Sequence, residues 1–116
     1  MRTAIRIIIR LDKQNKGFRF YAFKRGKAEG ILGSIAYYGD NQCIAIHAEG
    51  KDSVLQHYIS SLRQGTSFNK VISIMSIPDR LLNSEYFEIL PTIIPVAGSR
   101  INKTPSIGFK IGLFGL

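Results

Sequence analysis

The chain has 116 residues, 45% of them hydrophobic and 21% charged, which fits one compact domain and excludes two. Its single cysteine, Cys43, cannot form an internal disulfide and fits a reducing compartment, and no apolar run predicts secretion or a membrane span, so a cytoplasmic protein is expected. Sixteen Lys and Arg against eight Asp and Glu leave a formal charge of +8, which predicts an anionic ligand: nucleic acid, a phosphate metabolite or anionic lipid.

The N-terminal part of the chain predicts a strand followed by a helix. Isoleucine or leucine stands at every second position of residues 4–11, the period of a strand with one buried face. Residues 12–17 are rich in Lys, Asn and Gly and predict a loop. Apolar residues gather near one face of 18–29, which predicts a helix that Gly30 ends and that Gly26 weakens.

A hairpin and a second helix follow. Residues 31–38 and 44–48 predict two strands, joined through the Gly-Asp-Asn sequence at 39–41, which tolerates the left-handed conformations of a tight turn. Apolar residues recur at helical spacing over 53–64, and Gly65 is expected to cap this helix at its C-terminus. The residues of this helix that we expect to be buried are Leu55, Ile59 and Leu62.

The remaining elements define the fold class. Residues 71–77 are rich in β-branched side chains and predict a fourth strand, and 86–90 predict a short fifth. The order βαββαβ is typical of the ferredoxin-like plait, an α+β fold in which two helices cover one face of an antiparallel sheet. We therefore expect one domain over 1–90, followed by a basic tail over 91–116 that holds three of the four prolines.

Positive charge is concentrated near the N-terminus. Nine of the sixteen cations lie at or before Lys27, and Asp12 is the only acidic residue in that stretch. Anion chemistry is therefore expected there. The fold itself leaves the function open, because the plait hosts enzymes, metal carriers and RNA-binding proteins.

The first loop resembles a known phosphate-binding loop. Residues 11–19 read Leu-Asp-Lys-Gln-Asn-Lys-Gly-Phe-Arg, similar to the Gly-Arg-Val-Gln-Gly-Val-x-Phe-Arg usual in the acylphosphatase family, and Gln14, Phe18 and Arg19 match it. Residues 31–35 and 44–50 resemble two of the family's strand sequences, and 87–89 stand where its last strand ends. The resemblance covers residues 4–90.

The resemblance implies a phosphate site and a reaction. Acylphosphatases hydrolyse the mixed anhydride of a carboxylic and a phosphoric acid, and neither a metal nor another cofactor is expected. A planar guanidinium such as that of Arg19 binds two phosphoryl oxygens at once, and backbone N–H groups of a tight loop add fixed dipoles. The implied phosphate-binding residues are Lys13, Gln14, Asn15, Lys16, Gly17, Phe18 and Arg19.

Three positions depart from the family pattern. Asn15 replaces a loop Gly, and because Asn tolerates positive φ better than other non-Gly residues, the loop shape is expected to survive. Tyr37 stands where the family has the Asn that positions the attacking water, and a phenol cannot replace an amide in kind. Hydrolysis is therefore expected to be weak or lost, with phosphate or acyl-phosphate binding retained and acyl phosphate hydrolysis as the reaction if the protein is active. Tyr37 is equally well interpreted as an ordinary strand aromatic. Asp12 replaces an Arg, and its carboxylate would repel a phosphate if it pointed inward.

A non-enzymatic function is the alternative. Arg6 and Arg10 lie opposite the isoleucines of the first strand, and Tyr37 or Tyr38 would stack bases in a plait that binds RNA or another polyanion.

The two histidines predict no site of their own. His47 and His57 lack metal-ligand spacing and are expected to be ordinary surface histidines.

Overall fold

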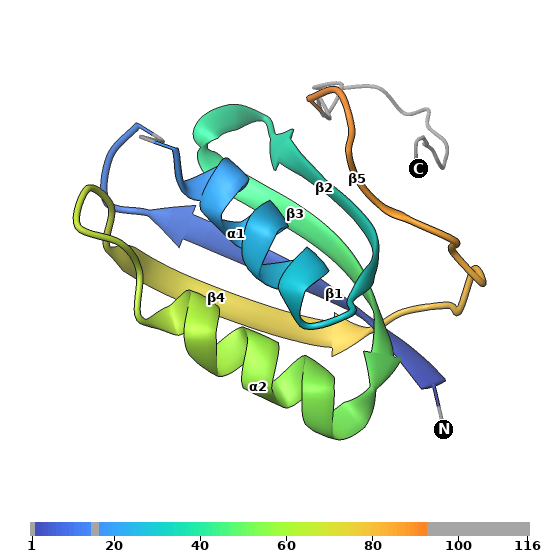
Figure 1. The fold of residues 1–116 in the computed structure, drawn as a ribbon. Coiled ribbons are helices and arrows are strands. Elements are labelled where there is room, and N and C mark those ends of the chain that lie inside the picture. Colours follow the sequence, from blue (N-terminus) through green and yellow to red (C-terminus); the bar gives the residue numbers. More distant parts are fainter. Residues whose placement is uncertain (1, 15–16, 93–116) are drawn as a thin grey trace.

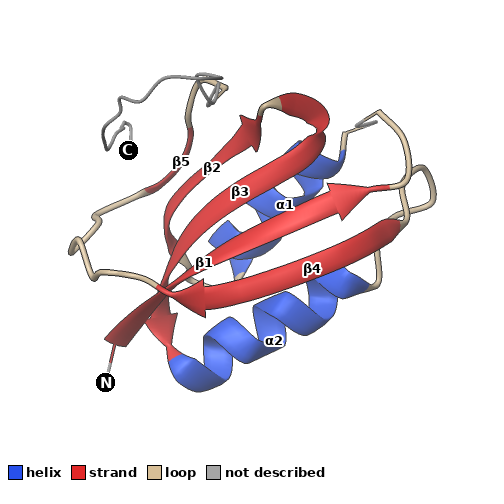
Figure 2. Cartoon of the chain, turned by 180° about the vertical axis from the view of Figure 1, so that it is seen from behind, coloured by secondary structure: helices blue, strands red, loops and turns tan. Residues whose placement is uncertain are grey.

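A computed structural model describes residues 2–14 and 17–92. These residues form a sheet in the order β4-β1-β3-β2-β5, with both helices on one face (Figure 1) and the opposite face open (Figure 2). The elements in chain order are β1 (Arg2–Leu11), α1 (Phe18–Ala28), β2 (Leu32–Tyr38), β3 (Asp40–Lys51), α2 (Asp52–Arg63), β4 (Val71–Pro78) and β5 (Phe87–Ile89). No helix of the described part of the chain is long and apolar enough to cross a membrane.

The predicted ferredoxin-like order is confirmed, with one strand much longer than expected. β3 begins at Asp40 and ends at Lys51, so residues 40 and 41 belong to the strand rather than to a turn. The reversal takes place at Gly39, whose φ of 80° lies in the left-handed region that glycine adopts without strain. β1 pairs with β3 along almost its whole length, from Arg2 opposite Lys51 to Arg10 opposite Cys43, and at the other end of β3 Asp40 pairs with Tyr38 of β2.

The sheet is mixed rather than wholly antiparallel, which corrects the prediction. β1, β2, β3 and β4 pair antiparallel as expected, but β5 pairs parallel with β2. The reason is topological. β4 and β2 run in opposite directions at opposite sides of the sheet, so the chain that leaves β4, crosses the end of the sheet and turns back must run along β2 in parallel (Figure 1).

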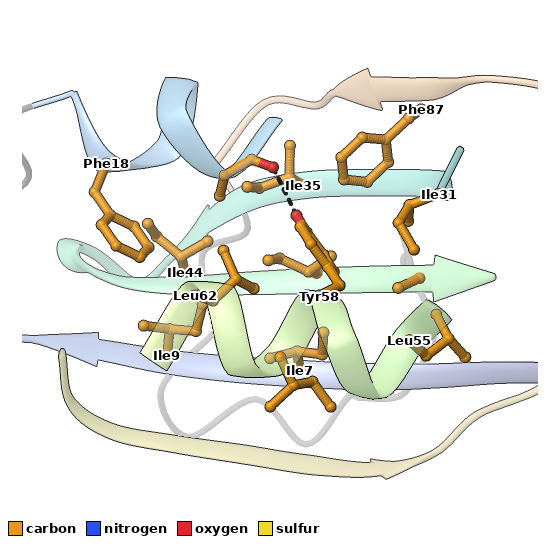
Figure 3. Packing of buried hydrophobic residues seen from close by; sticks show 14 of the residues in the cluster. Ile7, Ile9, Phe18, Ile31, Ile35, Ile44, Leu55, Tyr58, Leu62 and Phe87 are labelled. Atoms are coloured by element: carbon orange, nitrogen blue, oxygen red, sulfur yellow. Dashed lines mark hydrogen bonds between the residues drawn. The ribbon is translucent and has the colours of Figure 1, made fainter. Parts of the chain in front are cut away.

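The hydrophobic core lies between the sheet and the two helices (Figure 3). The predicted burial of Leu55, Ile59 and Leu62 is confirmed. The two helices are joined by a buried hydrogen bond, in which the Tyr58 hydroxyl donates to the Ala22 carbonyl at 2.7 Å (Figure 3). Other fully buried members of the core are Ile7, Ile9, Phe18, Ile31, Ile35, Ile44 and Ile46.

Gly26 has a packing role in α1 that offsets its poor helix propensity. The Phe87 ring of β5 lies against the helix at this point, and a Cβ on Gly26 would overlap that ring. Phe87 also stacks on Phe23, with ring centroids 5.6 Å apart. The glycine therefore lets β5 approach the helix layer and complete the core.

Candidate functional site

The start of α1 is shaped by a glycine and a buried aromatic residue. Gly17 precedes the helix with a φ of 84°, and its carbonyl accepts the first helical hydrogen bond, from the Tyr21 N–H at 2.9 Å. Phe18 is fully buried and anchors the first turn to the core. Gly17 has no side chain to cap the helix, and the first turn contains no acidic residue. The positive end of the helix dipole therefore faces the 12–17 loop without a compensating carboxylate in that turn.

Arg19 and Tyr37 are brought together at this helix end. The guanidinium carbon of Arg19 lies 4.0 Å from the centroid of the Tyr37 ring, within the range of a cation–π contact. Both side chains are half-buried, and the Tyr37 ring also packs against the core. A guanidinium stacked on a ring keeps its N–H donors in its own plane, so the stack orients Arg19 while leaving the donor geometry suited to an oxyanion.

Asp12 is turned toward a neighbouring loop. Its carboxylate accepts hydrogen bonds from the Lys70 backbone N–H at 3.1 Å and from the Asn69 amide at 3.4 Å. Desolvation acts to raise the pKa of the Asp12 carboxyl, but these hydrogen bonds outweigh it and lower the pKa below its ordinary value. Asp12, which stands where the similar acylphosphatase sequence has an Arg, therefore fastens the end of β1 to the start of β4.

Asn69 holds the beginning of the 12–17 loop and was not singled out by the sequence. Its side chain is buried, and its amide nitrogen donates to the Gln14 carbonyl at 3.2 Å and to the Lys13 carbonyl at 3.4 Å. Its own backbone N–H donates to the Thr66 hydroxyl at 3.1 Å. The 66–70 segment thus forms a second loop packed against the first, at the same end of the sheet (Figure 1).

The structure places five of the seven implied phosphate-binding residues. Lys13 and Gln14 are exposed where the loop leaves β1, and Gly17, Phe18 and Arg19 lie where it enters α1. Asn15 and Lys16 lie outside the described residues.

A second polar cluster lies on the open face of the sheet and overturns the prediction for His47. This histidine is buried, with Nδ1 at 2.9 Å from Asp79 Oδ2 and Nε2 at 2.6 Å from Glu49 Oε2. Because a carboxylate faces each ring nitrogen, the doubly protonated imidazolium fits this position best. His57 is exposed, as predicted, and lies 2.9 Å from a carboxylate oxygen of Glu29.

Glu49 is the centre of that cluster. Its carboxylate is fully buried and accepts hydrogen bonds from Arg2 at 3.1 Å and from the backbone N–H groups of Leu82 and Ser84, both at 3.0 Å. These bonds attach the 79–86 segment to the end of β3, on the open face, where the segment passes the end of the sheet on its way to β5. The cluster is therefore explained by its role in holding this crossover.

The same cluster uses arginines that a polyanion-binding face would need. Arg6 lies 3.7 Å from an Asp79 carboxylate oxygen, and Arg2 pairs with Glu49. Arg10 is exposed on this face, and Tyr38 is partly exposed. The contacts of Arg2 and Arg6 do not favour the RNA-binding alternative.

Comparison with known proteins identifies relatives by structure. No model of a protein family matches the sequence, and a search of curated proteins finds no match. The crystal structure of acylphosphatase from Bacillus subtilis matches with a TM-score of 0.70 and 27% identity, over 78% of this chain and 99% of that one. The structure of an acylphosphatase from Coxiella burnetii matches with a TM-score of 0.68 and 14% identity, over 77% of this chain and 93% of that one.

A similar domain occurs inside a larger protein. Full-length HypF, crystallised in a phosphate- and nucleotide-bound form, matches 82% of this chain with a TM-score of 0.72 and 18% identity, but this match spans only 13% of HypF. At that identity the likeness concerns the fold alone. Together the three matches show that the chain has an acylphosphatase-like fold, as its sequence predicted.

Proposed function

We propose that this domain binds a phosphate group, free or as an acyl phosphate, through the 12–19 loop and Arg19, and that hydrolysis is slow or lost. The observation that carries the proposal is the position of Arg19, stacked on Tyr37 at 4.0 Å beside the first turn of α1. A helix N-terminus and a guanidinium at one point favour a tetrahedral oxyanion, because both supply N–H donors and positive charge.

The charge around the loop supports binding. Lys13 and Arg19 flank the loop, and the Asp12 carboxylate is engaged by Asn69 and Lys70 on the side of the second loop. Repulsion between Asp12 and a bound phosphate is therefore smaller than the sequence suggested. The contacts of Asn69 also hold Lys13 and Gln14 in place before a ligand arrives, which lowers the entropic cost of binding.

The environment of Tyr37 supports weak hydrolysis. The acylphosphatase pattern has at this position an amide, which offers a donor and an acceptor close to the strand, whereas Tyr37 offers one hydroxyl at the end of a ring packed on the core. The face of that ring is occupied by Arg19. Losing one positioned hydrogen-bonding group costs a reaction on the order of a hundredfold in rate.

Titration with inorganic phosphate, followed by backbone amide chemical shifts, tests the binding. Shift changes should concentrate at residues 13–19 and disappear in Arg19→Ala. Lys24→Ala is the matched control, because Lys24 lies on the same helix and its loss changes the net charge equally. Equal weakening in both variants, or shifts spread over all lysine-rich surfaces, would show that the anion is attracted by net charge alone.

Hydrolysis of acetyl phosphate by the purified protein tests the second part. We expect a rate far below that of an acylphosphatase that carries the amide. A high rate that is abolished by Arg19→Ala would identify an active enzyme and contradict the inference drawn from Tyr37. We also propose that the protein works in the reducing cytoplasm, because the single cysteine of the sequence, Cys43, cannot form an internal disulfide.

A further inference from the structure

Within residues 2–14 and 17–92, β4 is an edge strand with no charged side chain and with no segment paired to its outer side. It lies at the outer side of the sheet, where it pairs only with β1 among the described strands (Figure 2). Its eight residues read Val-Ile-Ser-Ile-Met-Ser-Ile-Pro and include no charged side chain. Natural sheets usually guard such edges with lysines, inward-pointing charges or a covering segment, because an open edge is a template for another strand.

The register shows which backbone groups face outward. The Asp79 N–H donates to the Ala4 carbonyl, so these two residues form a hydrogen-bonded pair between β4 and β1. Hydrogen-bonded and non-hydrogen-bonded pairs alternate along antiparallel strands, so Ile77 and Met75 also direct their N–H and C=O groups to β1. The N–H and C=O groups of Ile74 and Ser76 therefore point away from β1, to the free edge. Pro78 falls on an outward position as well, where its missing N–H removes no bond from the sheet.

We propose that β4 pairs antiparallel with β4 of a second copy of this chain, forming a continuous ten-stranded sheet about a two-fold axis at Met75. In this register Ile74 of each copy stands opposite Ser76 of the other. Each of these two pairs exchanges two backbone N–H···O=C hydrogen bonds, which gives four in all. Shifting the register by two residues in one direction would bring in Pro78, and in the other direction would bring in the β-bulge near Leu11. In the register centred on Met75, Pro78 stands opposite Ile72 of the other copy, so the proline and the bulge both lie outside the four hydrogen bonds.

Side chains and charge favour the same arrangement. Met75 is 57% exposed and would meet its own copy on the open face, in a non-hydrogen-bonded pair where side chains are closest. Ile77 is 48% exposed and would be covered next to it. Each chain carries a net charge of +8, and the uncharged β4 is a place where two copies meet without opposing cations. A seam of one short strand pair falls below about 1,200 Å², the size of weak, reversible interfaces.

Sedimentation velocity over a concentration series tests the association. We expect a concentration-dependent dimer that strengthens with salt, because salt screens the repulsion between like-charged copies. Met75→Lys should give a monomer, since it sets two ammonium groups opposite each other. Phe68→Lys is the control, because it also replaces an exposed apolar residue and raises the net charge by one. A wild type that stays monomeric, or a Met75→Lys variant that still dimerises, would overturn the proposal.

Oxidative cross-linking tests the register. Cα atoms of a non-hydrogen-bonded pair lie about 4.5 Å apart, within disulfide range, so Met75→Cys should form a covalent dimer. Ile77→Cys should not, because four residue steps along the strands separate the two copies of that position by about 14 Å. Both positions are exposed on the same strand, so folding and thiol access are matched. Equal cross-linking of the two variants would contradict the stated register.

Discussion

The Arg19 guanidinium lies over the Tyr37 ring, with 4.0 Å between its central carbon and the ring centroid, and this contact joins the first turn of α1 to the end of β2. One aromatic ring thus orients the proposed anion-binding side chain, and by sequence resemblance it also stands where acylphosphatases carry the amide that positions water. Substitutions of Tyr37 should therefore change phosphate binding and hydrolysis in different directions.

Replacing the ring by the missing amide should increase hydrolysis. We expect Tyr37→Asn to raise the rate of acetyl phosphate hydrolysis by about tenfold or more, because an amide close to the strand can orient the attacking water. The measurement is the initial rate at saturating acetyl phosphate.

The increase in hydrolysis rate should require the amide at position 37 and the guanidinium of Arg19. Tyr38→Asn places the same amide on the next, partly exposed strand residue and should leave the rate unchanged. Adding Arg19→Ala to Tyr37→Asn should remove the gain. A rate that stays flat in Tyr37→Asn would mean that the lost amide is not what limits hydrolysis, and a high wild-type rate that falls would assign the role to the phenol.

Binding should respond to the ring rather than to its hydroxyl. Tyr37→Phe keeps a face for the guanidinium and should bind inorganic phosphate as the wild type does, whereas Tyr37→Leu should bind about two- to fivefold more weakly. That range corresponds to the roughly 0.5–1 kcal/mol of a partly exposed cation–π contact. Calorimetric titration with phosphate measures it, and equal affinity of the Leu and Phe variants would show that stacking contributes nothing to binding.

Loss of the Asn69 side chain should destabilise the fold and weaken phosphate binding at the candidate site. Its amide donates to the Lys13 and Gln14 carbonyls and to Asp12, so Asn69→Ala removes this donor from all three acceptors, and Asp12 keeps the hydrogen bond from the Lys70 N–H. We expect a loss of about 1–3 kcal/mol in the free energy of unfolding and weaker phosphate binding. Gln56→Ala, on the exposed side of α2, is the control. Unchanged phosphate affinity in Asn69→Ala would separate the second loop from the site.

Local patterns were sufficient to predict most of the fold. Alternating isoleucines in 4–11 and helical spacing around Leu55 and Leu62 report directly which side of each element is buried, and the structure confirms both. The parallel pairing of β5 was beyond reach, because it depends on where the 79–86 segment crosses the sheet, and this crossing is fixed by contacts with Glu49 that join residues more than thirty positions apart.

Some residues of the candidate site could be identified from local sequence, and others could not. A loop with a matching Arg19 could be recognised from its spacing, since residues 17–19 are consecutive and sit at one helix end. Asn69 and the environment of His47 could not be recognised, because their partners come from distant strands and loops. The sequence predicted a surface histidine at position 47, whereas contacts with the crossover segment bury it on the face of the sheet opposite the core.

Shortening a core side chain of α2 should destabilise the whole domain. Leu62 is fully buried against the sheet, so Leu62→Ala removes apolar contacts and leaves a cavity, with an expected loss of about 2–5 kcal/mol. Urea unfolding measures the change. Ser60→Ala, on the exposed face of the same helix, should shift the midpoint little. A loss well under 1 kcal/mol in Leu62→Ala would mean that α2 does not pack on the sheet as described.

The cluster around His47 should make stability depend on pH on both sides of a maximum. Burial opposes protonation of His47, but its hydrogen bonds to Asp79 and Glu49 outweigh this and raise its pKa. Burial likewise opposes ionisation of Glu49, but hydrogen bonds from His47 and from the backbone of Ser84 and Leu82 lower its pKa to about 2. The His47 contribution is complete below the ordinary pKa of 6.5 and is lost as pH rises through the higher folded value. The Glu49 contribution is complete above 4.5 and is lost as pH falls toward 2.

The free energy of unfolding should therefore be greatest between about pH 4.5 and 6.5 and fall above that range. His47→Gln should remove the decline on the alkaline side and cost about 3 kcal/mol at pH 5.5, because it leaves two carboxylates without the imidazolium between them. His57→Gln is the control, since His57 is exposed and its replacement should leave the alkaline decline in place. Urea unfolding from pH 3 to 9 measures both variants. An alkaline decline that persists in His47→Gln but vanishes in His57→Gln would assign the pH dependence to the surface histidine and contradict the buried imidazolium.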